Sequence, residues 1–260
     1  MKKVLITGAN GLIGSHLAEG LRQSGEYEVI ATGLRGDPEK NIQQMDMTDY
    51  EQVLQLTKGV DTILHFAVNK NQTDFLGAIV PIDLKGAYHL YEAARIHQVR
   101  RVVFASSNHA TGYYEIGDKV TPESPYRPDS LYGLMKGYIE IMGRLYSDKY
   151  GISSINIRIG NYNAKDVPDS ERKSHLWISH ADMLQLVRKC IEADGSHRFL
   201  TLYGTSGNRH NYYDIEYLEE LIGYKPEHDA EAYIKLAEQA HIPIRQDETE
   251  RQGGQMADRV

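Results

Sequence analysis

Short apolar runs alternate with helical patterns along the first two-thirds of the 260-residue sequence. Each run is four or five residues long, rich in Val, Ile and Leu, and flanked by residues typical of turns. Strands that are apolar on both faces lie between two layers of helices, which is typical of a parallel sheet. The pattern therefore predicts an α/β fold built on a doubly wound parallel sheet. The expected strands are 4–7, 29–32, 62–66, 102–105 and 154–158, and the expected helices are 11–24, 49–57, 74–97 and 130–150.

The regular alternation of strand and helix patterns ends at residue 160, and a polar and irregular stretch covers 161–177. Helices are expected near 180–193, 214–222 and 229–240, with one more strand at 199–203. We therefore expect a core of residues 1–160 and a small substrate-binding lobe of residues 161–260 that is interleaved with it. The polar tail from about residue 243 is expected to be loosely held unless it docks on another part of the protein.

The composition limits the classes of function. The formal net charge is −7, which argues against a protein that binds nucleic acid by neutralising phosphates. The single cysteine, Cys190, cannot form an internal disulfide, and this favours a cytoplasmic location. The N-terminal apolar run is too short for a signal peptide, and no stretch approaches the roughly 18 apolar residues of a membrane span. The eleven histidines do not fall into metal-ligand spacings, so no metal is expected.

A glycine-rich turn follows the first expected strand and opens the first expected helix. Glycine lets a pyrophosphate approach the main chain, and the start of a helix offers N–H groups to phosphates. Such turns are common in α/β proteins, but the strand–turn–helix context predicts a dinucleotide site in a Rossmann-type sheet. The residues expected at this site are Gly8, Asn10, Gly11, Leu12, Ile13 and Gly14.

The choice between NAD and NADP stays open. An acidic residue at the end of the second strand would bind the ribose hydroxyls of NAD. Gly33 stands at that position and Arg35 follows, which would tolerate a 2′-phosphate, whereas Asp37 could still serve as the ribose acid. Asp46, followed by Met47, suits a contact with the adenine amino group; the alternative is a solvent-facing loop aspartate.

Tyr132 and Lys136 lie four residues apart, so a helix would place them on one face. A nearby ammonium group favours the phenolate, which makes a tyrosine a usable general base. About one such pair is expected by chance among 18 tyrosines, so the pair needs support from Ser107. This serine follows the fourth expected strand, at the end where doubly wound sheets place ligands. Its hydroxyl can hold the reacting oxygen, although Ser106 and Ser107 could instead cap or turn the chain.

The glycine turn, the run His65-Phe66-Ala67, Ser107 and the Tyr132/Lys136 pair together resemble the extended short-chain dehydrogenase/reductase superfamily over nearly the whole chain. The resemblance implies that Tyr132 is the acid/base, that Ser107 orients the reacting oxygen, and that Lys136 holds the nicotinamide ribose and lowers the tyrosine pKa. It also implies a homodimer or higher homo-oligomer formed by helices 74–97 and 130–150. Asp83 stands where the superfamily has Asn. The further cofactor contacts implied are Ala67 and Ile159.

Finer motifs indicate the branch of the superfamily. The runs 103–109, 112–114, 157–160 and 251–254 resemble uronate dehydrogenases. Arg158-Ile159-Gly160-Asn161, and Arg172 five residues before Trp177, also resemble the short-chain-type glucose-6-phosphate dehydrogenase. In both, the arginine grips the anionic end of the sugar, which suits the rigid guanidinium fork; the alternative is a solvated loop arginine. The implied substrate-binding residues are Ser107, Asn108, His109, Tyr132, Asn161 and Arg172.

The sequence thus predicts an oxidoreductase that oxidises C1 of an anionic hexose, glucose 6-phosphate or a hexuronate, to the lactone by hydride transfer to NAD or NADP. A phosphosugar is slightly favoured by Lys173, His175 and Asn161. The alternative is a sugar-nucleotide epimerase or dehydratase, which predicts a larger C-terminal lobe. A non-enzymatic nucleotide sensor is a further alternative, but such proteins usually lose the tyrosine or the lysine. No nucleic-acid or membrane partner is expected.

Overall fold

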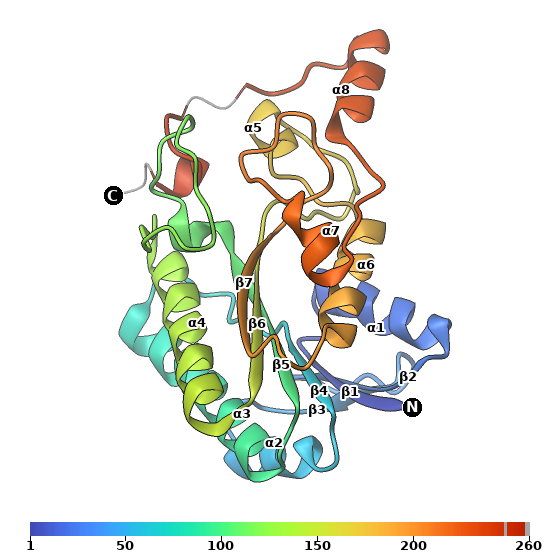
Figure 1. The fold of residues 1–260 in the computed structure, drawn as a ribbon, viewed down its shortest axis with the longest axis vertical. Helices are drawn as coiled ribbons and strands as arrows, with labels where there is room; N and C mark the ends of the chain where they lie inside the picture. Colours follow the sequence, from blue (N-terminus) through green and yellow to red (C-terminus); the bar gives the residue numbers. More distant parts are fainter. Residues whose placement is uncertain (247–248, 258–260) are drawn as a thin grey trace. The chain divides into compact units, whose positions relative to one another are not determined.

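The computed structural model describes residues 1–246 and 249–257, and its strands form one seven-stranded sheet in the order β3-β2-β1-β4-β5-β6-β7 (Figure 1). The pairs β1–β2, β1–β4, β2–β3 and β4–β5 are parallel. This is the predicted Rossmann-type doubly wound α/β fold. The strands are β1 (Lys2–Thr7), β2 (Tyr27–Gly33), β3 (Ile42–Gln44), β4 (Thr62–His65), β5 (Arg101–Ser107), β6 (Ser153–Ile159) and β7 (Phe199–Gly204).

The helices confirm the expected segments, with ends that shift by up to three residues. The short helices α5, η2 and η3 and the strand β3 were not expected. Among the described residues, no helix has the combination of length and apolar character that crossing a bilayer requires. The helices are α1 (Leu12–Ser24), α2 (Tyr50–Thr57), η1 (Phe75–Leu84), α3 (Lys85–Ile96), η2 (Asn108–Thr111), α4 (Leu131–Tyr150), α5 (Glu171–Ser174), α6 (His180–Glu192), α7 (Tyr217–Ile222), α8 (Ala230–Gln239) and η3 (Gly254–Met256).

The single helix expected over 74–97 has two kinds of winding. Its first part, η1, is a π-helix that contains Pro81, and α3 follows it directly. Proline has no N–H, and its ring collides with the carbonyl four residues earlier in an α-helix. The η1 segment, which contains this proline, has the wider π winding instead of an α-helix. Asp74 caps the start by accepting a hydrogen bond from Gly77 N at 2.8 Å.

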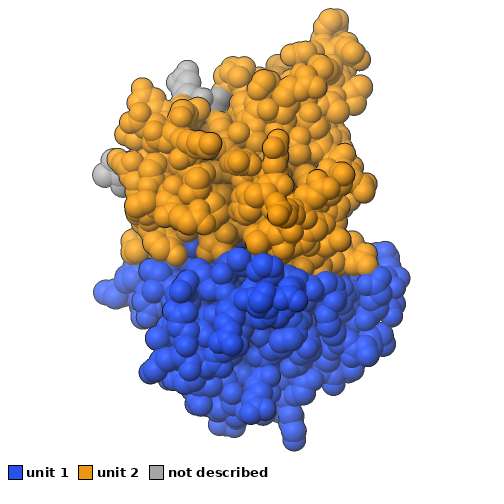
Figure 2. Space-filling view, in the orientation of Figure 1, with its two compact units in different colours: residues 1–105, 137–156, 191–200 blue, residues 106–136, 157–190, 201–260 orange. Residues whose placement is uncertain are grey.

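Contacts divide the chain into two compact units of interleaved segments, coloured separately in Figure 2. Unit 1 comprises residues 1–105, 137–156 and 191–200. Unit 2 comprises 106–136, 157–190 and the described part of 201–260. The sequence predicted a division at residue 160, which stays a prediction.

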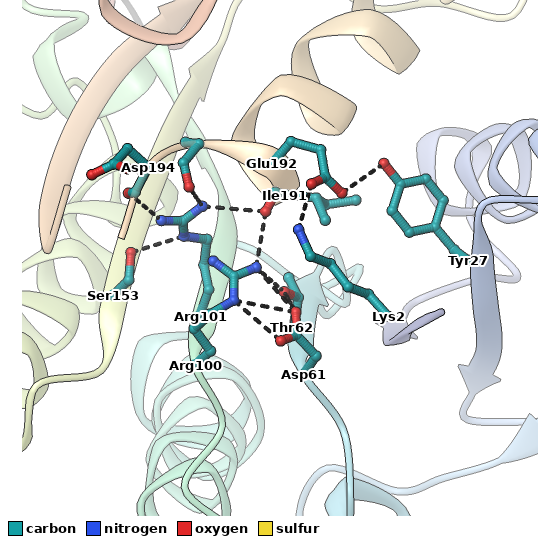
Figure 3. A network of polar contacts seen from close by, with 11 residues as sticks. Lys2, Tyr27, Asp61, Thr62, Arg100, Arg101, Ser153, Ile191, Glu192 and Asp194 are labelled. Atoms are coloured by element: carbon teal, nitrogen blue, oxygen red, sulfur yellow. Dashed lines mark hydrogen bonds and ion pairs between the residues drawn. The ribbon is translucent and has the colours of Figure 1, made fainter. Parts of the chain in front are cut away.

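Two arginines at the start of β5 hold unit 1 together (Figure 3). Arg101 is fully buried and donates hydrogen bonds to Ser153 Oγ at 2.9 Å and to the carbonyls of Ile191, Ala193 and Asp194 at 2.8 to 3.2 Å. Arg100 donates to the Asp61 carboxylate and to Ile191 O. The last carbonyls of a helix have no partner within the helix. The two guanidinium groups therefore complete the end of α6 and attract its negative pole.

Candidate active site

The glycine turn of unit 1 is packed main chain against main chain. Gly8 has a φ of +75°, and a Cβ there would lie only 2.6 Å from Ala67 N. A Cβ on Gly14 would overlap the backbone of Gly8, at 2.8 Å from its carbonyl carbon. The start of α1 at Gly11 has no side-chain cap, so its N–H groups are available to phosphate oxygens. The residues present thus fit a dinucleotide, which needs bare main chain at this point.

Thr7 fixes the loop after β4 beside this turn. Its Oγ1 accepts hydrogen bonds from Phe66 N at 3.2 Å and from Ala67 N at 3.1 Å, and lies 2.9 Å from His65 Nδ1. Sequence reasoning did not select Thr7, although its place directly before the glycine turn was an available signal. Asp83 holds the same loop further along, because its Oδ1 accepts from Asn69 N at 2.8 Å.

The end of β2 explains why Gly33 replaces the expected acidic residue. The side chain of Asn10 fills that space, and a Cβ on Gly33 would lie 2.7 Å from Asn10 Cγ. Arg35 is exposed and pairs with no carboxylate in the described parts of the chain. Asp37, the other candidate, accepts a hydrogen bond from Lys40 N at 3.3 Å and lies 3.8 Å from Lys40 Nζ. Arg35 is thus the residue of the two whose charge has no partner among the described residues, whereas Asp37 contacts Lys40.

Asp46, the residue predicted to contact the adenine, follows β3 in a half-buried turn. Its Oδ1 accepts from both Thr48 N and Thr48 Oγ1 at 2.8 Å. These bonds orient the carboxylate and leave its second oxygen for another donor. The adenine contact of Asp46 and Met47 stays a prediction.

In unit 2, the first turns of α4 carry Tyr132 and Lys136 on one face. Lys136 is 97% buried, and its Nζ lies 5.3 Å from the centre of the Tyr132 ring. Gly133 lets α4 pack directly on η2, because a Cβ there would lie 2.8 Å from the carbonyl carbon of His109. The His109 ring consequently meets the Tyr132 ring edge-on, with 5.8 Å between their centres. The predicted spacing thus brings the phenol, the ammonium and an imidazole together.

Ser107 ends β5, and its side chain is buried. Its Oγ accepts a hydrogen bond from His109 N at 3.3 Å, so it caps η2 as the alternative reading proposed. A hydroxyl that accepts one bond still has its proton to donate. Capping and holding a reacting oxygen are therefore compatible roles for this serine.

His109 is held by a buried aspartate. His109 Nδ1 lies 2.6 Å from Asp129 Oδ2, and the Asp129 side chain is fully buried. Asp129 Oδ1 accepts a further hydrogen bond from Ser130 Oγ at 2.8 Å. A carboxylate at Nδ1 keeps the proton on that nitrogen and leaves Nε2 as an acceptor. Sequence reasoning missed Asp129, because an aspartate just before a helix reads as part of a helix cap.

Asn108, which directly follows Ser107 in the chain, lies near Tyr213. Both are buried, and neither Asn108 Nδ2 nor Tyr213 Oη has a hydrogen-bond partner within the described residues. Burial raises the pKa of Tyr213 well above its usual value, while nearby Asn108 and Arg172 act in the opposite direction. The phenol thus stays protonated. Tyr212-Tyr213 is one of the runs that resemble the short-chain-type glucose-6-phosphate dehydrogenase, but the sequence analysis assigned Tyr213 no role in the site.

Arg172 lies in α5, which Ser170 caps through Lys173 N at 3.4 Å. Its Nη1 donates to Gln252 O at 2.6 Å, so the C-terminal segment reaches this arginine. Lys173 forms an ion pair with Asp169 at 2.8 Å. Arg172 has no carboxylate partner in the part of the chain that the structure describes. The guanidinium of Arg172 is therefore not neutralised, and residues 250–253 of the tail are docked beside it.

The remaining predicted residues have structural roles that leave their functional roles as predictions. Asn161 joins Trp177 in a parallel bridge, with Asn161 N donating to Leu176 O at 2.7 Å. Its side-chain oxygen accepts from Asn163 Nδ2 at 3.1 Å. Ile159 ends β6 and is buried.

Comparison with known proteins shows the family to which this chain belongs. The profile of the NAD dependent epimerase/dehydratase family matches residues 4–198, and the chain belongs to this family. A uronate dehydrogenase of Pseudomonas syringae pv. tomato is 35% identical over 94% of this chain and 89% of its own length. An NAD-dependent glucose-6-phosphate dehydrogenase of Haloferax volcanii is 30% identical over 86% of this chain and 92% of its own.

Solved structures extend the likeness to the whole fold. The crystal structure of uronate dehydrogenase from Agrobacterium tumefaciens has a TM-score of 0.88 and 32% identity, and the match covers 100% of this chain and 98% of that one. A GDP-mannose 3,5-epimerase of Arabidopsis thaliana is more distant, since the match covers 62% of this chain and 46% of the epimerase. The resemblance that the motifs indicated is therefore confirmed.

Proposed function

We propose that this protein is an NAD(P)-dependent dehydrogenase that oxidises C1 of a cyclic hexuronate to the lactone. The observation that carries the choice of substrate is the charge of Arg172, which pairs with no carboxylate of the described residues. Lys173 is neutralised by Asp169, and Arg209 lies 3.9 Å from Glu231. One guanidinium fork matches one carboxylate, whereas a phosphate monoester carries a charge of about −1.5 to −2 near neutral pH. The arrangement thus favours a hexuronate over glucose 6-phosphate, against the slight leaning of the sequence.

The mechanism follows from the groups on α4 and η2. Tyr132, as phenolate, takes the proton of the C1 hydroxyl, and the buried Lys136 ammonium favours that phenolate. Ser107 donates its hydroxyl proton to the same oxygen and holds it while the C1–O bond becomes a carbonyl. His109 accepts a hydrogen bond from a sugar hydroxyl at Nε2. Bound NAD(P) supplies the hydride acceptor for the hydrogen on C1.

The cofactor is held by the turn at Gly8, Gly11 and Gly14, with Asp46 at the adenine. Arg35 is exposed and uncommitted, whereas Asp37 is engaged by Lys40. This supports the use of NADP as well as NAD, because a free guanidinium attracts a 2′-phosphate.

The test is an absorbance assay of cofactor reduction with galacturonate, glucuronate and glucose 6-phosphate, each with NAD and with NADP. A hexuronate is expected to have the highest kcat/KM. Tyr132→Phe should lower kcat by about 10²–10⁴-fold, and Arg172→Ala should raise the KM for the hexuronate by about tenfold to a hundredfold. A preference for glucose 6-phosphate would refute the choice of substrate, and a fully active Tyr132→Phe would refute the mechanism.

We also propose a homodimer. On α4, Tyr138, Ile141 and Leu145 form a stripe at helical spacing, each more than half exposed, and α3 adds Tyr88. The two helices pack together through Tyr91 and Tyr146, whose ring centres lie 5.1 Å apart. A second copy of this face would cover the stripe, since large exposed apolar patches mark interfaces. Ile141→Glu should give a monomer in size-exclusion chromatography with light scattering, and a parent that is itself monomeric would refute the dimer.

The single buried cysteine supports a cytoplasmic location.

A further inference from the structure

Residues 250–254, called here the C-terminal segment, dock along one loop of unit 2. Ile116 N donates to Glu250 O at 2.9 Å, Gln252 N donates to Tyr114 O at 2.9 Å, and Gly253 N donates to Gly112 O at 2.8 Å. Glu115 and Arg251 form an antiparallel bridge between these bonds. The segment is thus tied to loop 112–118 at successive residues, as a strand would be.

Gln252 anchors the segment through its side chain. It is 99% buried, and its Nε2 donates to both Glu115 O and Asp118 O at 3.0 Å. A primary amide has two N–H donors, and both are used here. This anchoring holds the backbone of Gln252, whose carbonyl accepts the hydrogen bond from Arg172.

The C-terminal segment also contacts Arg172 and Asp129, two polar residues of the proposed substrate site. Gln252 O accepts the hydrogen bond from Arg172 Nη1 at 2.6 Å. Gly254 packs closely against the same guanidinium, where a Cβ would be 2.6 Å from Arg172 Cζ. Gly253 packs against Asp129, the partner of His109, with a Cβ position 2.8 Å from Asp129 Cγ. The two glycines thus leave the room that both side chains occupy.

We propose that the C-terminal segment is a positioning element of the substrate site, in which Gln252 and Gly254 aim Arg172 at the substrate anion. The proposal rests on the proposed function, since it takes Arg172 as the anion-binding group. An arginine loses side-chain freedom when it binds a ligand, and holding it beforehand reduces that cost. One N–H on the Gln252 carbonyl sets the plane of the fork, and the remaining donors face the carboxylate. The segment therefore determines anion affinity without itself contacting the substrate.

The sharpest test compares two alanine substitutions at glycines in the left-handed region of backbone angles. Gly254 has a φ of +68° and Gly223, the control at the end of α7, has a φ of +73°. Both variants carry the same backbone strain, but a Cβ on Gly223 meets only the flexible end of Lys189. Gly254→Ala should raise the KM for galacturonate by about tenfold with kcat within about threefold of the parent. Gly223→Ala should leave the KM unchanged.

A double-mutant cycle then tests whether the effect runs through Arg172. Combined with Arg172→Ala, Gly254→Ala should add less than about a twofold change in KM, because the group it displaces is gone. Gln252→Glu keeps the side-chain shape but removes the two donors, and it should also raise the KM. Calorimetric binding of galacturonate to each variant gives the same comparison without turnover.

The outcomes separate the two proposals. If the parent oxidises no hexuronate, the proposed function fails. If the parent oxidises galacturonate but Gly254→Ala matches Gly223→Ala in KM, only the positioning role is refuted. An equal rise in KM with and without Arg172 would likewise refute it, because the segment would then act on another group.

Discussion

Replacing Asp129 by Asn tests whether the buried carboxylate keeps His109 in the tautomer with its proton on Nδ1. The substitution keeps the shape of the side chain. The site has no spare room, since Cβ atoms on Gly112 and Gly253 would lie 2.6 and 2.8 Å from Asp129 Cγ. The asparagine must therefore stay in place and present one oxygen to two donors, His109 Nδ1–H at 2.6 Å and Ser130 Oγ at 2.8 Å. Its NH₂ group then faces one of them, which favours the other imidazole tautomer.

The magnitude follows from the loss of a charged acceptor. Hydrogen bonds to charged groups contribute about 1.5–3 kcal/mol and neutral ones about 0.5–1.5 kcal/mol. The midpoints of these ranges differ by about 1.25 kcal/mol, which corresponds to about an eightfold fall in kcat/KM for the hexuronate. The larger loss expected of Asp129→Ala would show a further effect of leaving both donors unpaired.

The assay is steady-state cofactor reduction, with the melting temperature measured in parallel. Asp148→Asn is the matched control, because Asp148 lies on α4 in an exposed pair with Arg144. Asp148→Asn should keep its kcat/KM within about twofold of the parent. If Asp129→Asn does the same, the carboxylate does not set the tautomer of His109.

Three further predictions concern stability and cofactor use. Arg101→Met leaves the carbonyls at the end of α6 unpaired and should lower the free energy of unfolding in urea by about 3 kcal/mol or more; a loss below 1 kcal/mol, as expected of an exposed arginine, would contradict this. Arg35→Ser should raise the KM for NADP by about tenfold and leave that for NAD unchanged, and equal effects on both cofactors would exclude a 2′-phosphate contact. Burial raises the pKa of Asp61, but the hydrogen bond and charge of Arg100 outweigh it and lower the pKa below 3.8. The stability from this pair is therefore present above about pH 4 and lost as the pH falls through the lowered pKa. Asp61→Asn should accordingly weaken the fall in the free energy of unfolding between about pH 4 and lower pH. An unchanged fall would show that the Asp61–Arg100 pair does not cause it.

The strands and main helices were predictable because their signals are local. The apolar runs at β1, β4 and β5 are buried throughout or nearly so, and burial on both faces is what makes a run continuous. Strand β3 was missed because it has three residues and only Ile42 is buried. The π winding of η1 was missed because Pro81 signals an interruption of an α-helix but not the form that the interruption takes.

The candidate site was predictable where motif spacing sets the geometry. Tyr132 and Lys136 are one helical turn apart, and Gly8 and Gly14 lie in one turn. The contacts of Asp129 with His109 and of Gln252 with Arg172 join residues 20 and 80 positions apart. No periodicity or propensity links such pairs, because their meeting depends on how the loops pack.

The crowding between Asn10 and Gly33 has a consequence for the evolution of cofactor choice in this chain. Any side chain at position 33 must displace the Asn10 amide, whose Cγ lies 2.7 Å from where the new Cβ would be. An acidic residue that selects NAD and the present asparagine thus compete for one volume. The two positions are expected to be epistatic: Gly33→Asp alone should be costly, and neutral only after position 10 has become smaller. The order of substitutions, and not only their identity, would then decide which cofactor a descendant of this sequence can come to prefer.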